Sequence, residues 1–541
     1  MKSRYILIVF ILLILPFTFS CRKGFEELNS DPNQFTKASD GSLFNGLVES
    51  LIPTGNEQFY VDNEVLYAQT QQAALTQNAW GNTAIGIEDI WGNYYGSLAE
   101  IRELERRFSE KDISTPGLNN MKAMVKIILA YKTFKVTDLF GDIPYSYAGY
   151  GFQNLEYLRP KFDLQRDIYI SLLNDLKWAD ENIDPTDIQE PFKSFTTFDK
   201  LFAGDLTKWR KMANSLRLRH AMRMEAKEPQ LAAEIIKDIL DNNKPVFMGY
   251  NIVALLESAC LWPAATGFTN SSVSWSFREH KNLRMGSNIW HQMSANDSMN
   301  GSGIYDPRMY IFFEGNKDNK WKPYPQIPDN LTPASGGIPY GDHRDDAANF
   351  SFKGNECLYS PFNFFIIKDE NYMPIVLITG AEMHFIKAEA YFRGIGVAMD
   401  KSKADVEYMN GLNSSVEWWR MVSNSLTLPL SKLKFNDMVH IPVNLSSATV
   451  LDHFGSWNAA NEDEKLKFMY TQRWIDAFRQ PQQAYAEARR TFKTPREGAP
   501  IQHFRLPYPQ TELTYNAANC QEAIQRQGGD FPSSKIWWIP N

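Results

Sequence analysis

The amino-acid sequence predicts an all-α protein in which paired helices stack side by side. Apolar residues recur at steps of three and four over long stretches, which is the spacing of an amphipathic helix. The clearest stretch covers residues 119–140, where Met121, Val125 and Ile128 share one face and Gly141 follows as a stop signal. Similar stretches lie at 62–77, 85–108, 163–182, 207–226, 230–242, 381–393, 401–421, 462–478 and 481–491.

Helix pairs of this length suggest an α-solenoid, although the sequence shows no clean 34-residue self-similarity. Asp163 is expected to cap the helix at 163–182. The segment 250–371 differs, because it is rich in Gly, Pro, Asn, Ser and aromatic residues, and long irregular segments often carry function. We therefore expect a helical scaffold over about 37–245 and 375–492, a loop-rich insert over about 246–374, and an irregular tail over 493–541.

The first residues indicate export and a lipid anchor. Lys2 and Arg4 precede an apolar run that ends near Cys21, a pattern typical of a bacterial lipoprotein signal. We expect residues 1–20 to be the signal peptide, Cys21 to be acylated, and 21–36 to form a polar tether. Plain secretion is an alternative, and so is a membrane helix, although the apolar run is shorter than the ~20 residues that a spanning helix needs.

Composition narrows the possible partners. The formal net charge of −7 argues against nucleic acid as the main partner, because phosphate binding needs a basic face. Aromatic residues make up 13% of the chain, and aromatic side chains beyond the needs of a core often form binding surfaces. Besides Cys21 there are Cys260, Cys357 and Cys520, which allow one disulfide at most, and no CxxC pair indicates a zinc site.

Several motifs occur in order along almost the whole chain. They are DPN at 31–33, TDLFGDIPYS at 137–146, PKFD at 160–163 with Ile168-Tyr169, WRKMANSLRLR at 209–219, AEMHFIKAEA at 381–390 and RLPYP at 505–509. Together they resemble the SusD/RagB family of nutrient-binding outer-membrane lipoproteins of Bacteroidetes, in its SusD-like branch.

The resemblance implies a scaffold of tetratricopeptide-like helix pairs (an α-α superhelix) with a loop-rich face for ligands, and a strand at 505–509. It also implies a role: a lipid-anchored protein of the outer membrane, facing the cell exterior, that captures a glycan or oligopeptide. Such a protein passes its ligand to a SusC-like TonB-dependent transporter. The resemblance implies neither catalysis nor a cofactor.

Trp80 is the preferred ligand residue, because it lies between two predicted helices and is flanked by Asn78 and Asn82. Indole rings stack on the C–H faces of sugars, while amides bind hydroxyl groups. A tryptophan packed between helices is the alternative for Trp80. The further candidates lie in the insert: Trp275, Trp321 and Tyr324. Among these, Trp275 and Trp321 have polar neighbours that suggest exposed rings.

Other motifs are interpreted structurally. Trp91, Tyr94 and Tyr95 have the spacing of core residues, and 137–146 reads as a helix stop followed by a turn. The arginines of 209–219 are expected on a solvated helix face, paired with carboxylates, rather than in an anion site. The segment 341–346 could hold a cation, but a solvated turn is the default.

No HExxH helix, GxSxG elbow or phosphate-binding glycine loop is present. The leading hypothesis is therefore a binding lipoprotein without catalytic activity. Two alternatives stay open: an anchored glycoside hydrolase, whose paired carboxylates could be far apart in sequence, and a helical-repeat scaffold for protein partners.

Overall fold

The computed structural model describes residues 38–77, 82–248, 257–263, 267–268, 271–333, 337, 356–364, 366, 373–425, 441–454 and 461–541. Several predicted features lie outside the described residues: Cys21 with the signal and tether, Asn78, Trp80 and the segment 341–346. In the described part of the chain, no helix is long and apolar enough to cross a membrane.

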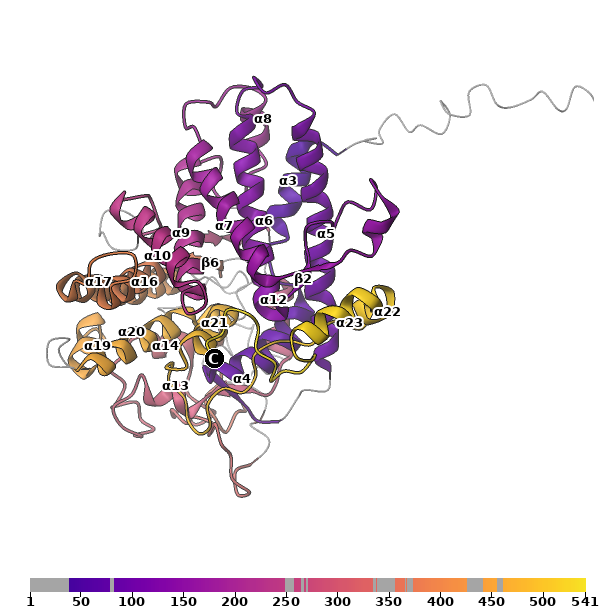
Figure 1. Cartoon of the computed structure of the whole chain (residues 1–541). Helices are drawn as coiled ribbons and strands as arrows, with labels where there is room; N and C mark the ends of the chain where they lie inside the picture. The colour runs from indigo at the N-terminus through magenta and orange to yellow at the C-terminus, as the bar shows by residue number, and fades with distance from the viewer. Residues whose placement is uncertain are drawn as a thin grey trace, which may run out of the picture.

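Long helices stand side by side in the first half of the chain (Figure 1). They are α5 (Thr83–Ser109), α6 (Leu118–Phe140), α7 (Gln165–Asn182) and α9 (Leu206–Met224), with α3 (Asp40–Glu49) and α8 (Phe192–Thr196) against their upper part. Helix α6 ends as predicted, because Gly141 adopts φ 84°, a conformation that favours glycine. Helix α9 begins at Asp205, whose carboxylate accepts from the amides of Thr207 and Lys208.

The chain from residue 229 onward continues the stack and then returns to its start. Its helices are α10 (Pro229–Asp241), α16 (Gly380–Arg393), α17 (Lys401–Ser425), α19 (Ser447–Phe454), α20 (Glu462–Asp476), η5 (Ala477–Arg479) and α21 (Pro481–Thr491). Helix α16 packs on α9, α17 and α20, and α21 packs on α9. Helix α21 also contacts the π-helix η2 (Glu57–Leu66) and α4 (Tyr67–Thr70), which joins the two ends of the scaffold.

Short antiparallel strand pairs tie the insert to the scaffold. Strand β4 (Ser258–Leu261) pairs with β6 (Ile375–Thr379), and β1 (Ala73–Leu75) pairs with β5 (Leu283–Met285). The third pair, β2 (Ile143–Pro144) with β3 (Phe162–Asp163), closes the loop after α6 around η4 (Leu155–Leu158). Because β4 lies near the start of the insert and β6 directly follows its end, their pairing holds the two ends together.

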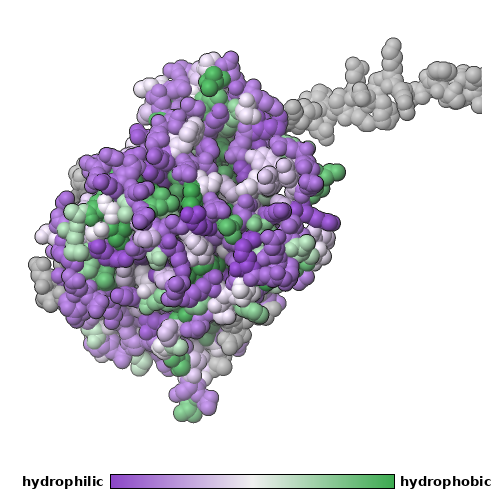
Figure 2. All heavy atoms as spheres, viewed as in Figure 1, coloured by the Kyte–Doolittle hydropathy of each residue, from purple (hydrophilic) through white to green (hydrophobic). Residues whose placement is uncertain are grey.

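The insert and the tail contain short helices that the sequence analysis does not predict. The insert holds α12 (Ser271–Glu279), α13 (Ser287–His291) and α14 (Arg308–Phe312), and the tail holds α22 (Gln510–Tyr515) and α23 (Ala517–Arg526). The prediction of a strand at 505–509 is wrong, since these residues form no strand. The Arg505 side chain is instead buried beside Asp530. Figure 2 shows a mainly hydrophilic outer face with small apolar groups between polar ones.

Two predictions of local detail are corrected. Asp163 does not cap α7, because its carboxylate accepts from the amides of Tyr145 and Ser146 across the β2–β3 pair. The arginines of α9 are paired with carboxylates, as predicted, but Arg217 and Arg219 are buried rather than solvated.

A buried charge network joins the late helices to α9. Glu382 on α16 pairs with Arg219 on α9 and with Arg473 on α20. On the neighbouring turns, Glu389 accepts from both terminal nitrogens of Arg490, at 2.9 and 2.7 Å. Although burial opposes its charge, the contact with Arg490 lowers the pKa of Glu389 to about 2. Because each buried charge has a partner, the network stabilises this packing as long as it stays complete.

The cysteines in the described part of the chain are all buried, and no disulfide joins them: Cys260, Cys357 and Cys520. Burial raises the pKa of the Cys260 thiol to about 12. The single disulfide that the sequence allows among these residues is therefore not formed.

Candidate ligand-binding site

The site begins with η2, which is wound as a π-helix. Such helices are rare and occur often near functional sites. Its polar side chains Glu57, Asp62 and Glu64 are buried, whereas its aromatic side chains Phe59 and Tyr60 are only half-buried. The helix thus turns its carboxylates inward and leaves two adjacent rings near the surface.

Trp275 on α12 joins these rings. Its indole centroid lies 5.7 Å from that of Phe59, and the Phe59 and Tyr60 rings lie 4.8 Å apart. Trp275 is 40% exposed, which is unusual for so large an apolar side chain. We call Phe59, Tyr60 and Trp275 the aromatic platform. Its three rings form one contiguous surface from two distant parts of the chain.

Backbone contacts fix Trp275 on the platform. A Cβ atom on Gly55 would lie 3.4 Å from Cε3 of the indole, so the chain before η2 passes directly against the ring. The hydroxyl oxygen of the next residue, Ser276, lies 2.7 Å from the carbonyl oxygen of Gly55. On the same helix, Val273 and Phe277 are buried in the core. Helix α12 is therefore anchored on both sides of the exposed indole.

The start of α5 lies beside the platform. Gly86 approaches η2 so closely that a Cβ atom there would lie 3.1 Å from Cβ of Tyr60. One turn earlier, Asn82 is exposed at the N-terminal end of α5. The structure thus brings Asn82 and Trp275, two of the predicted ligand residues, to the same region. The segment 78–81, which holds Asn78 and Trp80 and precedes Asn82 in the sequence, lies outside the described residues.

Trp321 and Tyr324 are placed differently from the prediction. Trp321 is 8% exposed and packs edge-on against Tyr310, and Tyr324 is 3% exposed and packs edge-on against Tyr359. The expectation of an exposed ring is wrong for Trp321, because Tyr310 packs against it, and the Tyr324 ring is buried against Tyr359. Neither ring offers a face on which a ligand could stack in this structure.

The predicted core role of the aromatic residues on α5 is confirmed. Trp91 and Tyr94 are buried, and the hydroxyl of the half-buried Tyr95 donates to the carbonyl oxygen of Pro144. Phe59 and Tyr60 are not predicted as site residues from the sequence, since they precede the helical stretch predicted at 62–77. A usable signal was the pair of adjacent aromatic residues in a polar context shortly before that stretch.

Buried ionisable groups lie beneath the platform. Burial raises the pKa of the Asp62 carboxyl to about 8, and the nearby Glu57 carboxylate adds to the rise. Glu57 pairs with Lys135 at 2.5 Å, while Glu64 lies 3.6 Å from His280, whose ring packs edge-on against Phe59. These groups therefore support the platform from behind and do not line its open side.

No group of three or more His, Cys, Asp or Glu side chains that could hold a metal ion occurs among the described residues. The chemistry that the platform offers is stacking on apolar ligand faces, and the exposed Asn82 at the start of α5 carries an amide that can form hydrogen bonds.

Together, the fold and the platform define a helical scaffold protein of the tetratricopeptide-like class with an exposed aromatic surface. The family model described as SusD-like, SusD and RagB outer membrane lipoprotein, matches residues 46–539. The chain therefore belongs to the SusD-like family of outer-membrane lipoproteins. The resemblance seen in the motifs and the predicted all-α fold of tetratricopeptide-like helix pairs are both confirmed.

Solved structures agree on the fold. A structure described as a chitin-binding protein is 20% identical, with a TM-score of 0.68, and the match covers 93% of this chain and 100% of that one. A SusD homologue from Bacteroides thetaiotaomicron is 21% identical, with a TM-score of 0.64 and the same coverage. One from Bacteroides fragilis is 18% identical, with a TM-score of 0.66, and again covers 93% and 100%. No curated protein matches the chain.

Proposed function

We propose that this protein is a cell-surface lipoprotein that captures a glycan on the aromatic platform and delivers it to a SusC-like TonB-dependent transporter. The observation that carries the proposal is the exposed indole of Trp275, which packs against the ring of Phe59, itself in contact with the ring of Tyr60. A sugar ring presents an apolar C–H face, and flat aromatic side chains that are already fixed can bind it at low entropic cost. The family membership supports the same role.

The structure favours binding over hydrolysis. A glycoside hydrolase needs two carboxyl groups about 5–10 Å apart that face each other across the bound sugar. Around the platform, the carboxylates of Glu57, Asp62 and Glu64 are buried behind η2 and are engaged with neighbours or shielded from solvent. This arrangement supports a protein that binds glycan without cleaving it.

The anchor and the transporter belong to the same proposal. Acylation of Cys21 would hold the domain at the outer membrane, where a ligand taken from outside could be passed to a neighbouring transporter. If the two proteins work together, a TonB-dependent transporter should co-purify with this chain from outer membranes solubilised in mild detergent. Its repeated absence would contradict the delivery role and leave the binding role intact.

Calorimetry tests the binding role. The purified protein is titrated with a panel of neutral oligosaccharides, including chitin fragments, and the products are analysed for cleavage. We expect at least one glycan to bind without turnover, and Trp275→Ala to weaken binding about tenfold or more. Phe152→Ala is the matched control, because Phe152 is 59% exposed on the loop between β2 and β3, away from the platform. Cleavage of the bound glycan would overturn the proposal.

A further inference from the structure

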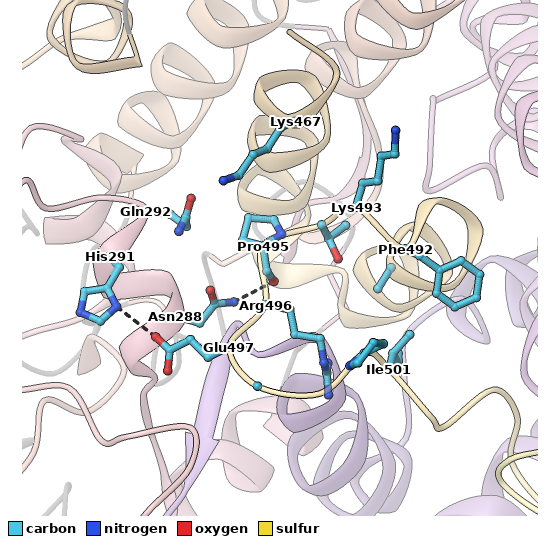
Figure 3. Close-up of a pocket in the computed structure, with 14 residues that line it drawn as sticks. Asn288, His291, Gln292, Lys467, Phe492, Lys493, Pro495, Arg496, Glu497 and Ile501 are labelled. Atoms are coloured by element: carbon cyan, nitrogen blue, oxygen red, sulfur yellow. Dashed lines mark hydrogen bonds and ion pairs between the residues drawn. The ribbon is translucent and has the colours of Figure 1, made fainter. Parts of the chain in front are cut away.

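Besides the aromatic platform, the structure contains a cavity between α13, α20 and the loop that follows α21 (Figure 3). Its volume of about 390 Å³ falls within the range of about 300–1,000 Å³ that is typical of small-molecule sites. Phe59, Tyr60 and Trp275 are not among its lining residues. The cavity is therefore separate from the aromatic platform.

The wall of this cavity is fixed by contacts within the protein. The amide of Glu497 donates to Oε1 of Gln71, and the Glu497 carboxylate accepts from the Ser287 hydroxyl at 2.6 Å. The same carboxylate lies 3.0 Å from Nδ1 of His291. One turn before His291, the Asn288 amide donates to the carbonyl oxygen of Pro495, as Figure 3 shows. The loop thus holds its shape without a ligand.

Positive charge exceeds negative charge around the cavity. Lys467, Lys493 and Arg496 line it together with a single carboxylate, that of Glu497, in a chain whose formal net charge is −7. Lys493 also lies 3.7 Å from Asp463, which is outside the cavity lining. Among the described residues, neither Lys467 nor Arg496 has a carboxylate within 4.0 Å. Such a local excess in an acidic protein creates a positive potential that attracts anions.

Arg496 contributes positive charge to the cavity, but its guanidinium is held by contacts within the protein. Its Nε donates to the carbonyl oxygen of Ala499 and its Nη1 to that of Gln69, both at 2.6 Å. Because carbonyl oxygens do not neutralise the guanidinium, its charge remains beneath the loop. The Arg496 side chain is half-buried, and this burial lowers the pKa of its guanidinium.

The groups that can touch a ligand lie at the mouth of the cavity. Figure 3 shows Lys467 reaching from α20 toward Gln292 at the end of α13, while the amine of Lys493 points away. An ammonium group binds carboxylate and sulfate as a point charge, and a side-chain amide can bind sugar hydroxyl groups as donor and acceptor. The two groups together suit a ligand that carries both a negative charge and hydroxyl groups.

We propose that this cavity binds a saccharide with an anionic substituent, a carboxylate or a sulfate, with Lys467 contacting the charged group and Gln292 a hydroxyl group. The site acts independently of the aromatic platform and does not require the function proposed for it. It would let the protein hold acidic glycans, or acidic ends of glycans, that stacking alone does not distinguish from neutral ones.

Titration of the full mature protein with three matched probes tests this site: a trigalacturonate, a sulfated trisaccharide and a neutral trisaccharide. We expect at least one acidic probe to bind more tightly than the neutral one, and its affinity to fall as salt is raised. Binding of the carboxylate probe alone would identify a uronate site, and binding of the sulfated probe alone a sulfate-sugar site.

Variants then locate the binding. Lys467→Gln should weaken the acidic probe about tenfold or more, and Lys467→Arg should retain most of the affinity. Lys177→Gln, which removes the same charge from an exposed position on α7, should change nothing. Trp275→Ala should also leave this binding intact, whereas it should weaken binding at the platform. Failure of both acidic probes to bind, an unchanged affinity in Lys467→Gln, or loss of the acidic probe in Trp275→Ala would overturn the proposal.

Discussion

The indole of Trp275 on α12 lies 5.7 Å from the ring of Phe59 on η2, centroid to centroid. The two residues are distant in sequence, so their contact depends on how α12 and η2 pack. Helix η2 in turn packs on the first turns of α5. The aromatic platform is therefore a product of tertiary packing, and changes beneath it should alter ligand binding without touching the ligand.

Gly86 tests this dependence. A Cβ atom at Gly86 would lie 2.8 Å from the carbonyl oxygen of Asn56 and 2.9 Å from Cγ2 of Val61, both too close for an ordinary contact. We expect Gly86→Ala to push η2 away from α5, to lower the free energy of unfolding by about 1–3 kcal/mol, and to weaken glycan binding. Urea unfolding and calorimetry measure the two effects.

Gly92 on the same helix provides the control. A Cβ atom at Gly92 would meet nothing within 4 Å, so Gly92→Ala should be neutral or stabilise the helix by up to about 1 kcal/mol. If Gly86→Ala and Gly92→Ala behave alike, the close approach of α5 to η2 does not shape the platform.

The Glu389–Arg490 pair should be essential for folding stability. Replacing Glu389 with Ala would leave the buried guanidinium of Arg490 with an incomplete set of partners, and breaking such a pair costs about 3–5 kcal/mol. Denaturant unfolding gives the value. Glu103→Ala is the comparison, since Glu103 pairs with Arg106 and Arg107 on the solvent side of α5 and should have a far smaller effect. Equal losses in the two variants would contradict a structural role for the buried network.

His503 should make the fold sensitive to mild acid. Burial lowers the pKa of His503 to about 4, whereas in the unfolded chain its pKa is about 6.5. Above about pH 6.5 the ring is neutral in both states, so it has no effect there. As the pH falls from about 6.5 toward 4, the unfolded chain binds a proton that the folded protein does not, and stability is lost.

The loss from His503 amounts to about 2 kcal/mol at about pH 5. Urea unfolding of the protein and of His503→Gln at about pH 7.5 and 5 measures it, with a smaller drop expected in the variant. Parallel pH profiles for the two proteins would show that His503 does not contribute.

The lipid anchor gives a cellular prediction. Cys21→Ala should move the protein from the membrane fraction to the soluble fraction, because the acyl chains are the proposed attachment. Cys520→Ala is the control, since Cys520 is a buried free thiol and its replacement should leave the protein at the membrane. Membrane retention of Cys21→Ala in cell fractionation would contradict the lipoprotein interpretation.

The sequence predicts features that depend on neighbouring residues. The end of α6 is an example, because a glycine directly after a periodic apolar stretch stops a helix wherever it occurs. Arg219 shows the limit of such reasoning. Its partner Glu382 comes from a helix much later in the chain, so only the folded structure reveals that the arginine is buried.

The candidate site could be predicted only in part, because its contacts also depend on the folded structure. The polar neighbours of Trp321 suggest exposure, yet Tyr310 covers its ring in the fold. Trp275 is exposed as expected, but its contact with Phe59, and through Phe59 with Tyr60, could not be inferred, because contacts between distant segments leave no local pattern in the sequence.

Proton NMR of a bound glycan tests directly whether a sugar ring stacks on Trp275. Sugar C–H protons that lie over an indole ring shift upfield, so a ligand identified by calorimetry is titrated into the protein and into Trp275→Ala. We expect the resonances of the C–H protons on one sugar face to shift upfield with the native protein. These shifts should be lost in Trp275→Ala and retained in Phe152→Ala. Identical shifts in the native protein and in Trp275→Ala would show that the glycan binds elsewhere and would contradict the account.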